Sequence, residues 1–179
     1  MVSFVAALLM FNPPAPSQEP IVAALSERLM TADMVARAKR KSGAPVEDLV
    51  RERAVIHEAE RQAGKIGIDM IFTVKVFKAQ IEANKIAQRA FLARWKGLPP
   101  FATVPNLARD VRPKLDRLTP TILEVLRHRH FWPASVFGQG PTDPIYRNAW
   151  KVAIAPLIER KVSIGSTSLP ISKPPVKKS

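Results

Sequence analysis

The alternation of apolar and polar positions is helical along most of the chain. Between about residues 69 and 97 the pattern repeats at spacings of three and four residues in turn, as in a helix that packs along another helix. The positions of this seam are Val74, Phe77, Ile81, Asn84, Gln88, Phe91 and Trp95. Because the two central positions, Asn84 and Gln88, are amides, the sequence predicts a buried helix face with a polar middle.

A second seam lies between about residues 20 and 41 and contains basic residues. Its positions are Ile21, Leu25, Arg28, Ala32, Val35 and Lys39. Arg28 and Lys39 are eleven residues apart, so at about 100° per residue they differ by only about 20° around the helix axis. Both cations therefore lie on the face that the apolar residues define.

A cation in such a seam is costly to bury unless an opposite charge compensates it. Two cations on one helix and two amides on another predict a polar cavity for an anion inside a helical bundle. The alternative is that long basic side chains reach out to solvent and that a single polar seam residue fixes helix register. That alternative explains any one of these positions better than it explains all of them together.

Start and stop signals divide the chain into four or five helices, with no strand, so the predicted fold class is all-α. The expected helices cover about 20–41, 48–66, 69–97, 106–131 and 145–161, and 132–144 is expected to be a loop. Pro20 suits a first helical turn, Asp48 and Asp69 suit N-caps, and Gly67 suits a helix end.

Composition narrows the possible chemistry. The 179 residues include no cysteine, which excludes disulfides, thiolate catalysis and cysteine zinc sites. The balance of 28 Lys and Arg against 15 Asp and Glu gives a net charge of +13, which attracts nucleic acid, acidic membranes or a small polyanion. A nucleic-acid-binding helical protein would carry its cations on solvent-facing stripes beside an apolar seam. Here Arg28 and Lys39 lie in the seam, which argues against that class.

Residues 2–11 are apolar, but ten residues are too few to span a bilayer. They resemble the core of a secretory signal, with Ala15 and Ser17 as small residues before a cleavage site, although the usual positive leader is missing. We therefore expect residues 1–18 to be a signal and the protein to be periplasmic or secreted, with no stable membrane insertion. The alternative is an N-terminal extension of a cytoplasmic protein.

A series of motifs in the first half resembles the all-helical (AroQ-type) chorismate mutases. In order, they are E-R-L at 27–29, Lys39, P-V-E-D at 45–48, R-E-R at 51–53, and V-F-x-x-Q-I-x-A-N-K-x-x-Q at 76–88. Each motif alone is weak, whereas the ordered set is specific. The resemblance implies a chorismate mutase-like helical bundle with a long third helix.

The second half resembles the secreted, two-module subclass of that family. The matching features are F-L-A-R-W-K-G at 91–97, a proline-rich linker, and D-x-R-P-x-L-D-x-L at 110–118. The resemblance implies a core site module at 19–97, a C-terminal helical module at 98–161, and a disordered basic tail at 162–179. Some secreted relatives carry a disulfide in the C-terminal module, which this chain lacks.

The resemblance also implies a set of substrate-binding residues. Arg28, Arg51 and Arg112 would bind the two carboxylates of chorismate. In this subclass the last arginine comes from the same chain, and Arg109 and Arg117 are alternatives to Arg112 for it. Asn84 would add a hydrogen bond at a carboxylate, where relatives often carry a hydroxyl residue.

Four further residues would act on the rest of the substrate. Lys39 would reach a carboxylate and the ether oxygen, and Gln88 would donate to that oxygen from the other side. Asp48 and Glu52 would hold the ring hydroxyl. The implied catalytic residues are thus Lys39, Gln88, Arg28 and Arg51.

The implied reaction is a Claisen rearrangement of chorismate to prephenate, which needs no cofactor, metal or nucleophile. The resemblance also implies a homodimer, and the sequence predicts no nucleic-acid partner. Three alternatives remain open: an isochorismate pyruvate lyase of the same fold, a cationic helical binding protein, and a related fold that has lost activity.

Overall fold

The computed structural model describes residues 19–128 and 132–165, and for residues 160–165 it describes the backbone alone. Five α-helices follow one another: α1 (Pro20–Ser42), α2 (Leu49–Ile66), α3 (Met70–Arg94), α4 (Arg112–His128) and α5 (Pro144–Gly165). A π-helical turn (Leu107–Val111) leads into α4, and a 3₁₀ helix (Ala134–Gln139) precedes α5. The described part of the chain contains no strand, which confirms the all-α prediction.

Both ends of α2 and the start of α3 follow the local chemistry of the sequence. The Asp48 carboxylate accepts a hydrogen bond from the Arg51 amide at 3.0 Å, and the Asp69 carboxylate accepts one from the Phe72 amide at 3.0 Å. Both carboxylates thus satisfy amides that have no partner within the helix. Gly67 ends α2 with a φ of 73°, a left-handed conformation that favours glycine.

The second half departs from the predicted boundaries. The expected helix at 106–131 begins as a π-helical turn, in which the Asn106 side chain accepts from the amides of Ala108 and Arg109. Regular α-helix starts only at Arg112. The end of the expected helix, at 129–131, lies outside the described residues.

The segment expected as a loop contains the 3₁₀ helix. Its residue Phe137 is buried, and the Phe137 carbonyl accepts a hydrogen bond from the Trp150 indole at 2.8 Å. This contact comes from tertiary packing, which no local pattern signals. Helix α5 also runs past the expected end at residue 161, to Gly165.

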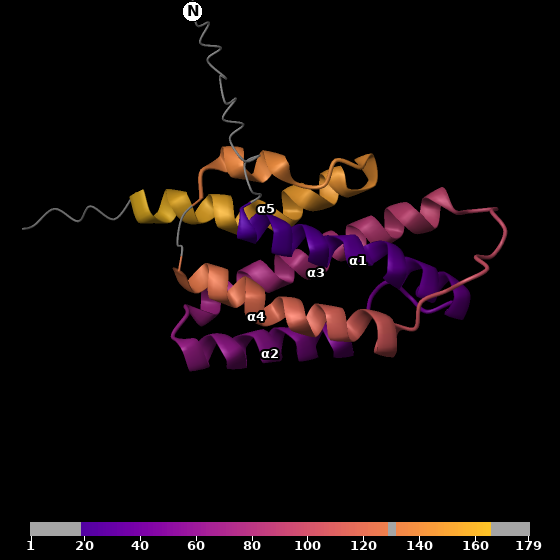
Figure 1. Cartoon of the computed structure of the whole chain (residues 1–179), viewed down its shortest axis with the longest axis horizontal. Helices are drawn as coiled ribbons and strands as arrows, with labels where there is room; N and C mark the ends of the chain where they lie inside the picture. The colour runs from indigo at the N-terminus through magenta and orange to yellow at the C-terminus, as the bar shows by residue number, and fades with distance from the viewer. Residues whose placement is uncertain (1–18, 129–131, 166–179) are drawn as a thin grey trace, which may run out of the picture.

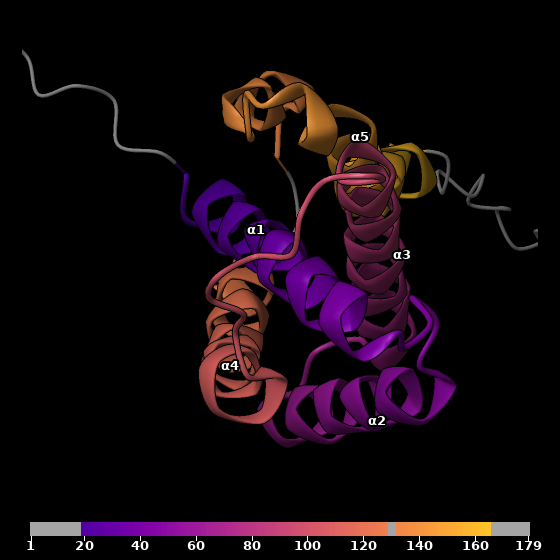
Figure 2. The same cartoon turned by 90° about the vertical axis from the view of Figure 1, so that its right-hand side faces the viewer.

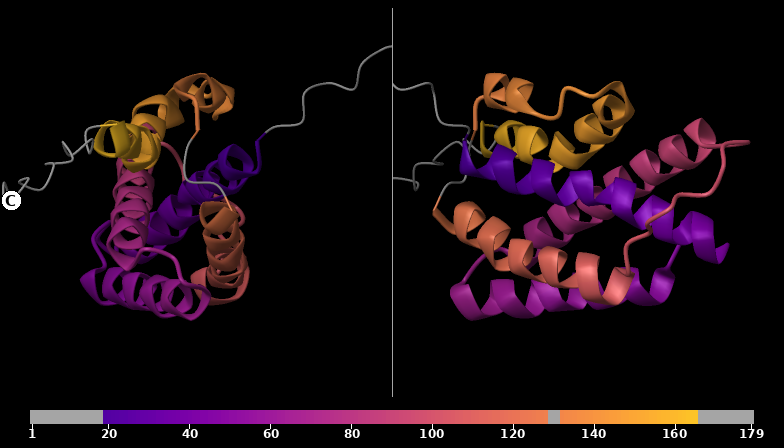
Figure 3. Two further views of the ribbon diagram at one scale, coloured as in Figure 1. Left: turned by 90° about the vertical axis from the view of Figure 1, so that its left-hand side faces the viewer. Right: turned by 45° about the vertical axis from the view of Figure 1, so that its right-hand side comes forward.

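The helices are arranged with α2 and α4 side by side, α1 crossing next to them, and α5 along the opposite side of α3 (Figures 1 and 2). Figure 3 shows the same pairing of α2 with α4 from two further directions. Helices α1 and α3 therefore lie in the middle, packed on α5 at one side and facing α2 and α4 at the other.

All five helices contribute to one hydrophobic cluster. Helix α2 contributes the buried Ala59 and Ala63, and its partly buried Val55, Ile56 and Ile66 pack against the cluster. The large fully buried residues of the cluster include Ile21, Leu25, Leu29, Phe77, Ile122, Leu126 and Leu157. This cluster joins the 19–97 and 98–161 segments. The division into two modules stays a prediction, because a shared core does not mark where one folding unit ends. Residues 1–18 and 166–179, which carry the expected signal and most of the expected tail, lie outside the described residues.

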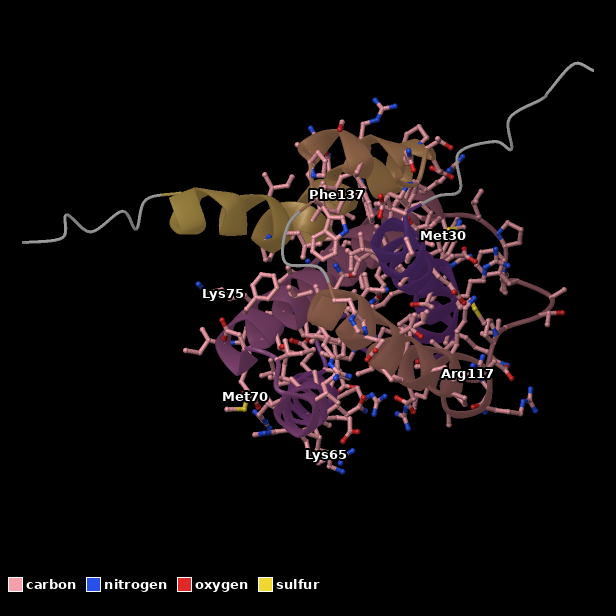
Figure 4. All side chains as sticks on the ribbon, turned by 60° about the vertical axis from the view of Figure 1, so that its left-hand side comes forward. Met30, Lys65, Met70, Lys75, Arg117 and Phe137 are labelled. Atoms are coloured by element: carbon pink, nitrogen blue, oxygen red, sulfur yellow. The ribbon has the colours of Figure 1, made fainter. Side chains whose placement is uncertain are left out.

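Not all of the positive charge is at the centre of the molecule. Figure 4 shows Lys65 and Lys75 at the outside of α2 and α3, and both side chains are exposed. No helix within the described residues is long and apolar enough to cross a membrane.

Candidate active site

A pocket of about 740 Å³, counting the part open to solvent, lies between α1, α2, α3 and the start of α4. All eight candidate residues from the sequence line it: Arg28, Lys39, Asp48, Arg51, Glu52, Asn84, Gln88 and Arg112. The structure thus brings together side chains from four helices. The cavity predicted from the two seams is present.

Arg28 is the most deeply buried cation of the pocket, with 5% of its surface exposed. Burial, and then the nearby positive charge of Arg51, lower the pKa of Arg28 to about 10, while Asp116 acts in the opposite direction. The guanidinium carbon lies 5.3 Å from the centre of the Phe77 ring. Its buried Nη1 atom has no hydrogen-bond partner among the described residues. An anion entering the pocket would satisfy both this donor and the charge.

Arg51 projects from the first turn of α2, and a carboxylate of α4 fixes its side chain. Its guanidinium forms an ion pair with Asp116 of α4 at 3.2 Å. This pair links α2 to α4 next to Arg28. Asp116 therefore partly balances two arginines that repel each other.

Lys39 lies near the C-terminal end of α1 and is 8% exposed. Its ammonium donates to the Val46 carbonyl at 2.5 Å, which ties α1 to the segment before α2. Burial lowers the pKa of Lys39 below its ordinary value of 10.5, with Asp48, Glu47 and Glu52 opposing the shift.

Glu52 is paired with a lysine to which the sequence analysis gave no role. Lys85 of α3 contacts Glu52 at 3.2 Å and Glu82 at 2.5 Å. Burial disfavours the charged lysine, but the hydrogen bonds to Glu82 and Glu52 outweigh burial and raise the pKa of Lys85. Lys85 therefore stays charged and fixes one oxygen of Glu52.

Gln80 is the second pocket residue that the sequence analysis missed. It is 1% exposed, its amide nitrogen donates to the Ala153 carbonyl of α5 at 2.9 Å, and its carbonyl oxygen has no partner among the described residues. Gln80 thus connects α5 to the pocket wall. Both Gln80 and Lys85 are fixed letters of the motif at 76–88, which was the available signal.

The two seam amides bond to each other and to α1. The Gln88 amide nitrogen donates to the Asn84 carbonyl oxygen at 2.7 Å. The Asn84 amide nitrogen faces the carbonyls of Arg28 and Leu29 and the hydroxyl of Thr31 at 3.2–3.5 Å. In this orientation Asn84 directs its donors toward α1, so donation to a substrate carboxylate stays a prediction that requires the amide to turn.

Of the three arginines considered for the C-terminal module, Arg112 lines the pocket. Arg109 is exposed and pairs with Asp110 at 2.8 Å. Arg117 is exposed on α4 and does not line the pocket (its position is labelled in Figure 4). The geometry therefore favours Arg112 over its two neighbours.

Five cations and two carboxylates line the pocket. One carboxylate, Glu52, is already bound to Lys85. The excess of positive charge in a partly enclosed space suits a small dianion whose two acidic groups need separate partners. Among residues 19–128 and 132–165, no group of three His, Cys, Asp or Glu side chains is placed to hold a metal ion.

Comparison with known families and proteins agrees with this geometry. The family model described as chorismate mutase type II matches residues 19–89. A secreted chorismate mutase of Mycolicibacterium smegmatis is 32% identical, over 75% of this chain and 82% of the relative. A secreted chorismate mutase of Yersinia pestis is 33% identical, over 56% of this chain and 54% of the relative.

Solved structures show the same fold. The chorismate mutase of Burkholderia phymatum superimposes with a TM-score of 0.71 at 33% identity, over 78% of this chain and 94% of that one. The secreted chorismate mutase of Yersinia pestis gives a TM-score of 0.63 at 23% identity, over 76% of this chain and 94% of that one. The second similarity concerns the fold alone.

Proposed function

The chain belongs to the type II chorismate mutases, and we propose that it rearranges chorismate to prephenate in the pocket between α1, α2, α3 and α4. One observation carries the assignment to this pocket: eight residues chosen from sequence motifs line a single cavity with an excess of cations. The same observation argues against an inactive relative, because the polar positions of the site are occupied.

The proposed binding mode uses the arginines for the two carboxylates of chorismate. Arg28 has an unpaired Nη1 donor and a charge that burial makes costly, so a carboxylate beside it is stabilising. Arg51 and Arg112 approach the same cavity from α2 and α4. A planar guanidinium can hold a carboxylate through two hydrogen bonds, which fixes orientation as well as position.

The rearrangement breaks the ether C–O bond while a C–C bond forms within the same molecule, and no proton is transferred. Holding the side chain of the substrate over its ring supplies part of the rate. Negative charge grows on the ether oxygen as the C–O bond lengthens. We assign Lys39 and Gln88 as the donors to that oxygen, because donors aimed at developing charge stabilise the transition state more than the substrate.

The ring hydroxyl would be held by Asp48 and Glu52. Lys85 supports this assignment for Glu52, since its ammonium pairs with one of the carboxylate oxygens at 3.2 Å. The second oxygen accepts the Asp48 amide at 3.3 Å and keeps a lone pair that can accept a hydrogen bond from the ring hydroxyl. Asp48 already accepts the Arg51 amide as an N-cap, so its position is set by the start of α2.

The test is to incubate the purified chain with chorismate, follow the loss of chorismate absorbance, and identify the product by NMR. We expect prephenate. Pyruvate, formed with an aromatic acid from chorismate or from isochorismate supplied in a parallel reaction, would instead assign the related lyase activity. Consumption of neither compound would contradict the proposed function.

Export and dimerisation are further parts of the proposal. Export is supported by the apolar residues 2–11 and by two relatives that are named secreted chorismate mutases. The homodimer is supported by the family resemblance. Cell fractionation tests the first, and sedimentation of the purified protein tests the second.

A further inference from the structure

A buried threonine next to the pocket begins a chain of hydrogen bonds that runs through the two seam amides, Asn84 and then Gln88. Thr31 of α1 is 1% exposed and does not line the pocket. Its hydroxyl donates to the Arg28 carbonyl at 2.7 Å and accepts from the Asn84 amide nitrogen at 3.2 Å. The Asn84 carbonyl oxygen in turn accepts from the Gln88 amide nitrogen at 2.7 Å.

The direction of these hydrogen bonds follows from simple counting. A hydroxyl has one proton, and Thr31 gives its proton to the Arg28 carbonyl, so it can only accept from Asn84. The Arg28 and Leu29 carbonyls near the same end of Asn84 are acceptors as well. Three acceptors around that end require the amide nitrogen of Asn84 there, so its oxygen must point to Gln88.

The orientation of Gln88 follows from that of Asn84. Because Asn84 presents an oxygen, Gln88 must present its amide nitrogen, which carries two N–H donors. One donates to Asn84, and no described residue accepts the other. With the opposite orientation, Gln88 would place its carbonyl oxygen against another oxygen.

We propose that Thr31 is a positioning residue that acts through Asn84 to fix the amide nitrogen of Gln88 as the donor end. This inference rests on the proposed function, in which Gln88 donates to the ether oxygen. A Gln88 amide free to flip would spend part of its time with an oxygen facing the developing negative charge. The relay of Thr31, Asn84 and Gln88 removes that unproductive orientation before substrate binds. It requires the Asn84 nitrogen to stay directed at α1, so it excludes the donation from Asn84 to a substrate carboxylate that the resemblance implies.

The relay itself can be tested without any activity. In the ligand-free full-length protein, the side-chain amide NMR signals of Asn84 and Gln88 are assigned by their loss in Asn84→Ala and Gln88→Ala. Thr31→Val should shift both signals, although Thr31 does not touch Gln88, and Thr31→Ser should leave both near their original positions. Thr31→Ala serves as a second variant without a hydroxyl if Thr31→Val does not fold.

Thr73→Val is the matched control. Thr73 is fully buried in α3, its hydroxyl also donates to a backbone carbonyl, that of Asp69 at 2.9 Å, and it does not line the pocket. It should shift neither amide signal. A Gln88 signal that stays in place in both Thr31→Val and Thr31→Ala would overturn the relay.

Steady-state kinetics then test the catalytic consequence of the relay. Thr31→Val should lower kcat about three- to tenfold with KM within about twofold, since the lost hydrogen bond orients a donor that matters in the transition state. Thr31→Ser and Thr73→Val should stay within about twofold of the original kcat. An unchanged kcat in Thr31→Val, or an equal loss in Thr73→Val, would overturn the positioning role. If the original chain makes no prephenate, the proposed function fails, and the amide signals still decide the relay.

Discussion

Arg51 of α2 and Asp116 of α4 form an ion pair at 3.2 Å across the pocket wall, 65 positions apart in sequence. The pair joins the segment that carries most of the family motifs to the C-terminal helices. Asp116 is also the group that opposes the lowered pKa of Arg28. One carboxylate outside the substrate-binding set thus faces two of the proposed carboxylate-binding arginines.

Asp116→Asn should lower KM for chorismate, because it removes an anion that competes with the substrate for Arg51. The pair is largely exposed, so the free energy of unfolding should change by less than about 1 kcal/mol. Steady-state kinetics and denaturant unfolding measure the two effects. Asp110→Asn, which breaks the exposed pair with Arg109, is a control that should leave KM unchanged. A rise in KM for Asp116→Asn would show that Asp116 positions Arg51 instead of competing for it.

Arg112→Ala should weaken activity severely while leaving the helix content unchanged. In the proposed binding mode Arg112 would give a substrate carboxylate a charge-assisted hydrogen bond from α4. Arg112 lines the pocket and is exposed, so little packing depends on it. Arg109→Ala and Arg117→Ala should behave like the original chain, because neither residue lines the pocket. If Arg109→Ala or Arg117→Ala is inactive while Arg112→Ala is active, the C-terminal segment completes the site through that other arginine and not through Arg112. Three active variants would remove the C-terminal helices from the active site.

Gln88→Glu should shift the activity optimum to acid. At neutral pH a carboxylate at position 88 would face both the Asn84 carbonyl oxygen and the developing charge on the ether oxygen, and it could donate to neither. When protonated it could donate as the amide does. The measurement is the pH profile of kcat, compared with that of the original chain. Superimposable profiles would mean that residue 88 does not contact the ether oxygen.

The decline of activity at alkaline pH should reflect Lys39 together with Arg28, whose pKa is lowered to about 10 by burial. Burial lowers the pKa of Lys39 below 10.5, and only the charged form donates effectively to the ether oxygen. Activity should therefore be complete below the lowered pKa and decline as pH rises through it, before pH 10.5 is reached. Circular dichroism over the same range checks that the fold persists. A kcat/KM that stays constant up to pH 10.5 in folded protein would contradict the assignment of Lys39.

Most of the first half of the structure could be predicted from the sequence. Asp48, Asp69 and Gly67 mark helix ends through local chemistry that acts within a few residues. Arg28 and Lys39 revealed the cavity because a cation is out of place in an apolar seam. The residues of α2 and α4 that line the pocket came from the family resemblance, since their own helix patterns do not mark them.

The features that could not be predicted from the sequence depend on contacts between segments that are distant along the chain. The 3₁₀ helix near Phe137 is held by the Trp150 indole, and Gln80 bonds to the Ala153 carbonyl of α5. The pairing of Lys85 with Glu52 likewise joins α3 to α2. Such pairs become visible only when the helices are placed in space. The direction of the Asn84 amide also required the positions of the α1 carbonyls.

The cations within this pocket should accelerate the rearrangement, and Lys39 allows the most direct test. Lys39→Ala and Lys41→Ala compare a buried pocket lysine with an exposed lysine two positions further along, outside the pocket. Removing one donor to a developing negative charge typically costs about 3–4 kcal/mol of barrier, or a factor of about 10²–10³ in kcat. The decisive measurement is the initial rate of prephenate formation by both variants, with circular dichroism confirming the fold. We predict that Lys39→Ala loses measurable activity and that Lys41→Ala keeps it, whereas a Lys39→Ala rate above about a tenth of the original would contradict the account.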